Sequence, residues 1–280
     1  MHLVDSKGCK IATECFGSRH DPALILIMGA TASMLGWPDT LCTALADKGL
    51  FVIRFDHRDT GMSTTLPPGK AEYAVEDMAE DVVSIMEAYG LFRVALMGMS
   101  LGGYIAQILS LQHPTRVRAL VLLGAEPIGW DGPPLPHISE RFLSHFGKVS
   151  SLDWNDNTAV TDFLLEIERL SVGTGQAFCE CEKKARIQQV LRRTSSPASM
   201  FNHASVPVRN DWTGRYREVA CPTLVIHGTE DPILPIENGR AISTGIHNAE
   251  FMALEKVGHE IPESNIAALA DRVAQHVRSS

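Results

Sequence analysis

The chain has 280 residues, of which 45% are hydrophobic and 21% are charged, and its formal net charge is −8. This composition is ordinary for a globular protein, and the length suits one large domain or a core that carries an insertion. The acidic balance and the lack of a run of basic residues argue against nucleic acid as a partner.

The sequence carries no pattern typical of secretion or of a membrane. Its first residues, MHLVDSKGCK, show no apolar stretch behind a basic start, so we expect no signal peptide. The longest apolar run, 23–28, is far shorter than the roughly 20 residues that cross a bilayer. The six cysteines lack disulfide or zinc spacing. We expect a cytoplasmic monomer or homodimer with reduced cysteines and with no metal, cofactor or membrane partner.

Short apolar runs alternate with amphipathic stretches in the first half of the chain, which is the pattern of parallel strands joined by crossover helices. We predict strands over 10–17, 23–29, 51–58, 94–100 and 117–125. We predict helices from an N-cap at Asp39 to a stop at Gly49, over 75–89 and over 101–112.

The alternation stops after Pro127 and resumes near Pro207. The stretch between them is too long for an ordinary connection, and it contains helical patterns over 160–170 and 180–193. Strands over 222–228 and 249–257 and a helix from Ser264 follow it. We expect residues 127–205 to form a helical cap over the carboxyl ends of the sheet, with 1–126 and 206–280 as the core.

A candidate nucleophile lies between a predicted strand and a predicted helix. Gly98-Met99-Ser100-Leu101-Gly102 fits the G-x-S-x-G elbow pattern. The serine of an elbow sits on a strained turn, where side chains two residues away would collide with each other and with neighbouring strands. The helix that follows directs N–H groups at the site where negative charge develops. We predict that Ser100 is the nucleophile, although a glycine-rich turn before a helix gives the same pattern.

Of eleven histidines, His259 is the best candidate for a general base. It lies in VGHEIP, between the last strand and the last helix, at the carboxyl edge where open α/β sheets place their sites. Other histidines have structural interpretations. His227 falls inside a strand, His113 lies at a helix end, and His57 sits beside the charged residues Arg58 and Asp59.

A carboxylate is needed to orient the imidazole and to stabilise the imidazolium. Asp231, in HGTEDPILP, lies just past a predicted strand. Glu230 and Glu126 are alternatives, but the rigid turn of Asp231-Pro232 favours Asp231. The resulting chain order of Ser, Asp and His is the order found in α/β-hydrolases.

Acyl transfer also needs N–H donors for the tetrahedral oxygen, each contributing roughly 10²–10³ in rate. We predict the backbone N–H of Leu101, directly after the nucleophile, and that of Ala30, in the loop after the strand 23–29. An ordinary glycine turn at 28–31 is the alternative.

Nearly the whole chain resembles the α/β-hydrolase superfamily. Besides the elbow, the run DHRDTGMS at 56–63 is similar to the D-x-R-x-x-G-x-S turn common there. Together with Met28-Gly29 and LGWP at 35–38, it resembles the aclacinomycin methylesterases of anthracycline biosynthesis. It also resembles related esterases of resistance-gene cassettes, some of which open macrolide rings. Many superfamily members have His-Gly in place of Met28-Gly29, and the methylesterase-like branch also lacks that histidine.

The resemblance implies an α/β-hydrolase fold, with a mostly parallel sheet flanked by helices and a helical cap. It implies a serine hydrolase that acts on a bulky polyketide-type carboxylic ester, either an anthracycline-type methyl ester or a macrolide lactone, the latter giving antibiotic resistance. Met28, Trp37 and Met99 are expected to border the substrate site. Apolar cap residues are expected to line a wide pocket unless they serve packing alone: Phe163, Phe178, Met200 and Phe201.

Three other functions fit the same fold. The triad also serves cofactor-free perhydrolases or haloperoxidases and carbon–carbon bond hydrolases. A receptor that binds a ligand without turning it over is the third, because fold alone does not settle function.

Overall fold

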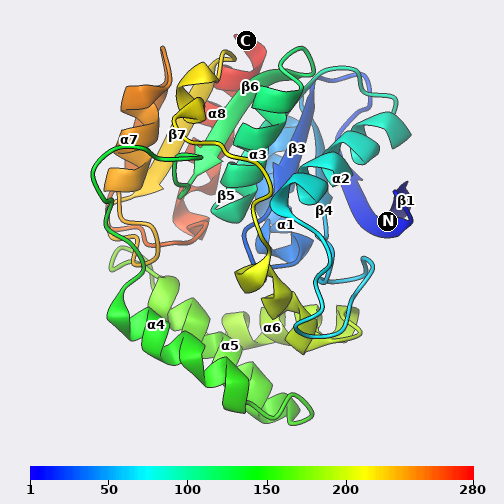
Figure 1. Cartoon of the computed structure of the whole chain (residues 1–280), viewed down its shortest axis with the longest axis vertical. Helices are drawn as coiled ribbons and strands as arrows, with labels where there is room; N and C mark the ends of the chain where they lie inside the picture. Colours follow the sequence, from blue (N-terminus) through cyan, green and yellow to red (C-terminus); the bar gives the residue numbers. More distant parts are fainter.

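The computed structural model describes residues 1–280, and its centre is a single eight-stranded sheet (Figure 1). The strand order is β1-β2-β4-β3-β5-β6-β7-β8, with β1 and β2 antiparallel to their neighbours and the other pairs parallel. The strands are β1 (His2–Ser6), β2 (Cys9–Phe16), β3 (Ala23–Ile27), β4 (Phe51–Phe55), β5 (Val94–Met99), β6 (Val117–Leu123), β7 (Thr223–Gly228) and β8 (Glu250–Leu254).

Helices cover both faces of the sheet because β3 and β5 are apolar on both sides. Alternate side chains of β3 divide between two cores: Ile25 and Ile27 in one, Leu24 and Leu26 in the other. The first core lies under α2 (Val75–Ala88), α3 (Leu101–Gln112) and α7 (Glu237–Gly245), and the second under α1 (Asp39–Asp47) and α8 (Ile266–Arg278).

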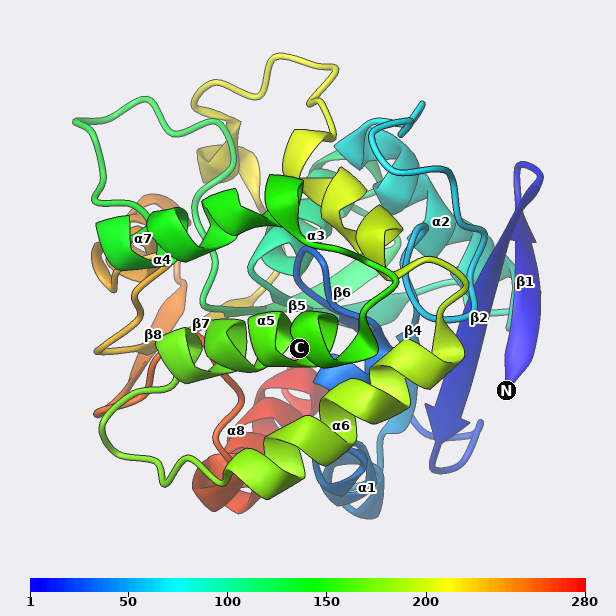
Figure 2. The same ribbon diagram turned by 90° about the horizontal axis from the view of Figure 1, so that it is seen from below.

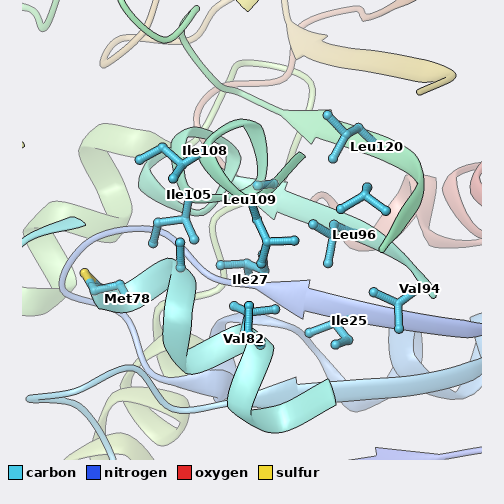
Figure 3. Packing of buried hydrophobic residues seen from close by; sticks show 14 of the residues in the cluster. Ile25, Ile27, Met78, Val82, Val94, Leu96, Ile105, Ile108, Leu109 and Leu120 are labelled. Atoms are coloured by element: carbon cyan, nitrogen blue, oxygen red, sulfur yellow. The ribbon is translucent and has the colours of Figure 1, made fainter. Parts of the chain in front are cut away.

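Figure 3 shows the first core at close range, with Ile25 and Ile27 packed against Val82 of α2 and Ile105 of α3. Each of these side chains is buried, and burial of a large aliphatic side chain stabilises the fold by about 1.5–3 kcal/mol. The core therefore fixes the strands whose carboxyl ends carry the candidate site.

The predicted α/β order is confirmed, with strand ends that differ by a few residues. The expected N-cap at Asp39 is wrong by one residue, since Pro38 is the cap and Asp39 begins α1. The structure adds two elements in the core that the sequence patterns did not predict, β1 and α7. None of the helices combines the length and the apolar character that a membrane span requires.

The connection between β6 and β7 holds α4 (Glu140–Phe146), α5 (Asn157–Ser171) and α6 (Glu180–Arg193), together with short 3₁₀ turns at Gly147–Ser151, Pro197–Ser205 and Arg215–Glu218. Figures 1 and 2 show the three α-helices lying together at one end of the sheet. Phe163, Met200 and Phe201 form a small core of their own there. These helices occupy the region predicted to be the cap, and the boundaries 127–205 stay a prediction.

A buried ion pair ties the end of α6 to the sheet. Asp56, directly after β4, is completely buried and accepts hydrogen bonds from the N–H groups of Met34 at 2.8 Å and Met62 at 3.0 Å. The Arg193 guanidinium lies 2.9 Å from the same carboxylate. Burial raises the pKa of Asp56, and the Met62 N–H and Arg193 oppose that rise. The positive charge of Arg193 therefore stabilises the buried negative charge of Asp56.

We expect Arg193→Met to lower the free energy of unfolding by about 3 kcal/mol, because it leaves the Asp56 carboxylate buried without its cation. Urea unfolding measures the loss. Arg192→Met is the matched control, since Arg192 is exposed, forms no ion pair and should change stability by less than about 0.5 kcal/mol. Equal small effects of the two substitutions would contradict the assignment.

Candidate active site

Ser100 occupies a strained turn between β5 and α3. Its backbone has φ 52° and ψ −121°, which side-chain-bearing residues rarely adopt. A Cβ atom on Gly98 would lie 2.2 Å from the Gly102 carbonyl oxygen, and one on Gly102 would lie 2.0 Å from the Ile27 carbonyl oxygen. Only glycine fits at both positions. The chain therefore turns tightly enough to present the Ser100 side chain to a cavity at the end of the sheet.

His259 and Asp231 form a short hydrogen bond. Nδ1 of His259 lies 2.7 Å from Oδ2 of Asp231, and the Asp231 side chain is fully buried. Its other oxygen accepts the N–H groups of Ile233 at 2.9 Å and Leu234 at 2.8 Å. With Asp231 fixed in this way, the Nδ1 proton of His259 is engaged and Nε2 is left for another partner.

Asp231 remains ionised despite its burial. Burial alone would raise its pKa, but the adjacent His259, the nearby His227 and the Leu234 N–H bring the pKa below the usual value for an aspartate. His227 lies in β7, and its Nε2 donates to the Leu234 carbonyl at 2.6 Å. Burial lowers the pKa of His227. His227 is thus a packed core residue, as its position in a strand predicted.

Ser100 and His259 line one cavity of about 330 Å³, most of whose lining residues are hydrophobic. Its walls come from the loops after β3, β5 and β8 and from the helices between β6 and β7. Met28 and Met99 line it as well, and their contact with a substrate stays a prediction. No hydrogen bond joins the Ser100 hydroxyl to the His259 ring, and in enzymes without bound substrate such contacts are often long.

The loop after β3 passes beside Ser100. A Cβ atom on Gly29 would lie 3.2 Å from the Ser100 Cβ atom. The next residue, Ala30, lines the cavity, and its N–H has no acceptor within the protein. Leu101 is the first residue of α3, where an N–H has no partner within the helix. Two unpaired donors therefore flank the serine from the positions expected of an oxyanion hole.

Two buried histidines, His57 and His203, hold this loop in place. The sequence pattern suggested a structural role for His57 but none for His203. Nε2 of His57 donates to the Met28 carbonyl at 2.8 Å. His203, in the 3₁₀ turn after α6, accepts the Thr31 N–H at 3.0 Å and donates to the Arg58 carbonyl at 2.8 Å. His203 is 172 residues from Thr31 along the chain, and no local pattern signals such a contact.

The expectation that Trp37 borders the substrate site is wrong. Its side chain is completely buried in the core beneath α1 and does not line the cavity, whereas its neighbours Leu35 and Gly36 do. Of the four apolar residues that were expected to line a pocket, Phe163, Phe178, Met200 and Phe201, only Met200 lines this cavity. Phe163 and Phe201 pack in the small core of the cap, and Phe178 lies under the Arg169 guanidinium.

The described residues contain no group of three or more His, Cys, Asp or Glu side chains placed to bind a metal ion. All six cysteines are unpaired in the structure.

The sequence matches the family model described as the alpha/beta hydrolase fold over residues 22–265. The chain belongs to the α/β-hydrolase family. Among solved structures, an esterase (EaEST) of Exiguobacterium antarcticum aligns with a TM-score of 0.81 at 20% identity, covering 99% of this chain and 98% of that one. This likeness shows the shared fold.

Curated relatives include hydrolases of several substrates. The chain is 28% identical to the rhodomycin D methylesterase DnrP of Streptomyces peucetius, over 99% of this chain and 98% of the relative. It is 38% identical to RutD of Variovorax paradoxus, named as a candidate carbamate hydrolase, over 88% of each chain. This α/β-hydrolase is therefore homologous to methylesterases.

Replacing His57 by Leu should make stability less dependent on pH. Burial, and to a lesser extent His203, lowers the pKa of His57 to about 3, and the bond to Met28 only partly opposes this. The unfolded chain binds a proton at this histidine below about pH 6.5 and the folded chain does not, so acidification destabilises the parent. Between about pH 7 and pH 4.5, the parent should lose about 2 kcal/mol more than His57→Leu. Urea unfolding at both pH values measures this, and equal losses would contradict the assignment.

Proposed function

We propose that the chain is a serine-dependent hydrolase of carboxylic esters, with Ser100, His259 and Asp231 as its catalytic triad. The proposal rests above all on the 2.7 Å hydrogen bond between His259 and the buried Asp231, beside the cavity that Ser100 also lines. A hydrogen-bonded imidazole and carboxylate near an elbow serine are the parts that acyl transfer requires.

In the proposed mechanism, the Ser100 oxygen attacks the ester carbonyl while Nε2 of His259 takes its proton. The N–H groups of Ala30 and Leu101 receive the oxyanion that forms. His259 then gives the proton to the departing alcohol, which leaves an acyl group on Ser100. Asp231 keeps the Nδ1 proton in place and stabilises the imidazolium without becoming protonated.

A water molecule completes the cycle. His259 accepts a proton from the water as its oxygen attacks the acyl carbonyl, and the collapse of the second tetrahedral intermediate returns the proton to Ser100.

For the substrate, we propose a methyl ester of a bulky polyketide-type compound. The methylesterase DnrP supports this class, since its alignment covers nearly all of both chains. The cavity wall is largely apolar, with Phe142, Phe146, Leu164 and Ile187 among its residues, which suits a hydrophobic ring system. At about 330 Å³ the cavity accommodates the ester end of such a molecule, with the remainder at its mouth.

Carbamate hydrolysis is the second candidate, favoured by the 38% identity to RutD. The same triad can attack a carbamate carbonyl: the alcohol leaves, a carbamoyl group stays on Ser100, and water then releases it. A macrolide lactone, and with it antibiotic inactivation, stays a prediction from the sequence resemblance without support from these relatives.

A mass-spectrometric screen of the purified protein tests the proposal. The panel contains anthracycline methyl esters, macrolides, carbamates and short acyl esters, each incubated with the parent and with Ser100→Ala. We expect turnover of a methyl ester, visible as loss of 14 mass units, by the parent only. Carbamate turnover alone would favour the second candidate. Turnover that persists in Ser100→Ala would refute the assigned nucleophile.

Asp231→Asn should lower kcat by about 10⁴, because an amide cannot hold the required imidazole tautomer. Steady-state kinetics on the best ester of the screen measures the loss. Glu126→Gln is the matched control, because Glu126 also follows a strand at this edge but does not line the cavity. A loss below about tenfold in Asp231→Asn would remove it from the triad.

A further inference from the structure

The loop that carries His259 is bonded directly to the cap. The N–H of His259 donates to the Ser171 carbonyl, at the end of α5, with a length of 2.8 Å. The side chain of the next residue, Glu260, accepts the N–H of Gly173 at 3.0 Å. Two adjacent residues of the histidine loop are therefore held by one short segment of the cap.

The loop that carries Asp231 is bonded to the same segment. The carboxylate of Glu230, the preceding residue, accepts the Thr174 N–H at 2.6 Å and the Thr174 hydroxyl at 2.8 Å. The Thr174 N–H and hydroxyl hold the pKa of Glu230 below its usual value, so these bonds are made to a charged acceptor. The N–H groups of two successive cap residues, 173 and 174, are thus bound by carboxylates that adjoin two different members of the proposed triad.

The backbone of cap residues 171–173 packs directly against the backbone of residues 256–258 in the histidine loop. A Cβ atom on Gly258 would lie 2.0 Å from the Ser171 carbonyl oxygen, and a Cβ atom on Gly173 would lie 2.3 Å from the Lys256 carbonyl oxygen. No side chain fits at either position without moving a backbone. The contact between the cap and the histidine loop therefore requires glycine on both sides, at Gly173 and at Gly258.

We propose that Glu230 and Glu260 are positioning residues that clamp cap segment 171–174 and thereby hold the Asp231–His259 pair in alignment. Ser171 and Glu260 also line the cavity with Ser100, so the placement of the cap around a substrate and the alignment of His259 are coupled. The inference rests on the proposed ester hydrolysis. Neither glutamate exchanges a proton with the substrate. Each one acts by fixing the backbone of the loop that carries Asp231 or His259.

Substitution of both glutamates by alanine tests the clamp. A displaced imidazole slows chemistry more than binding, so Glu230→Ala/Glu260→Ala should lower kcat by about 10–100-fold and change KM by a smaller factor than kcat. Glutamine retains an oxygen that accepts the same N–H groups, so Glu230→Gln/Glu260→Gln should recover kcat to within about threefold of the parent. Glu263→Ala is the control, because Glu263 is exposed nearby and its side chain makes no hydrogen bond. The single alanine variants replace the double variant if it fails to fold.

A second readout does not depend on turnover. The Nδ1 proton of His259, bonded to Asp231, should give a low-field proton resonance, identified by its loss in His259→Gln. We expect this resonance to shift or broaden in the alanine pair and to persist in the glutamine pair. An alanine pair with parental kcat and an unchanged resonance would overturn the clamp, as would equal losses in the alanine and glutamine pairs. A parent without Ser100-dependent turnover would defeat the proposed function, and the resonance would then decide the clamp by itself.

Discussion

The hydrogen bond between Asp231 and His259 is the interaction on which the proposed chemistry depends. A buried carboxylate is costly unless each of its oxygens is satisfied, and here two N–H groups and one imidazole provide that. Because Asp231 stays ionised, it fixes the proton of His259 on Nδ1 and leaves the other ring nitrogen able to accept one. Without such a base, Ser100 would not lose its proton, and no oxyanion would form for the unpaired N–H of Ala30 to stabilise.

The cap is bonded to the site at several points rather than resting on it. Arg193 neutralises Asp56 after β4, His203 holds the backbone of Thr31 in the loop after β3, and segment 171–174 binds the loops of Asp231 and His259. Each contact reaches a different loop at the carboxyl end of the sheet. A rearrangement of the cap would therefore be transmitted to the loop of the candidate oxyanion donor Ala30 and to the base.

Short sequence patterns predicted those elements whose structure depends mainly on neighbouring residues in the chain. The all-apolar run of β3 indicates a strand buried on both faces, and the glycines around Ser100 fit an elbow because a strand pattern precedes them and a helix pattern follows, so both were predictable. Helix α7 was not, because Gly239 and Gly245 lower its helix propensity. Those glycines let it pack against His227 and Tyr216, which only the folded chain reveals.

The error at Trp37 and the missed contacts of the cap have a common cause. An aromatic residue in a loop motif near the site is equally suited to a pocket wall and to a core, and burial decides between them. Hydrogen bonds from backbone N–H groups to distant carboxylates, as at Glu260, leave no trace in the spacing of residues. Such contacts require the three-dimensional structure.

Covalent labelling is the most direct measurement of whether these residues form one catalytic unit. A fluorophosphonate reacts with a serine hydroxyl only when a neighbouring base activates it, and intact-mass and peptide analysis locate the product. The account predicts a single label on Ser100 in the parent and at least a hundredfold slower labelling in His259→Ala. Labelling elsewhere, or an equal rate of Ser100 labelling without His259, would contradict it.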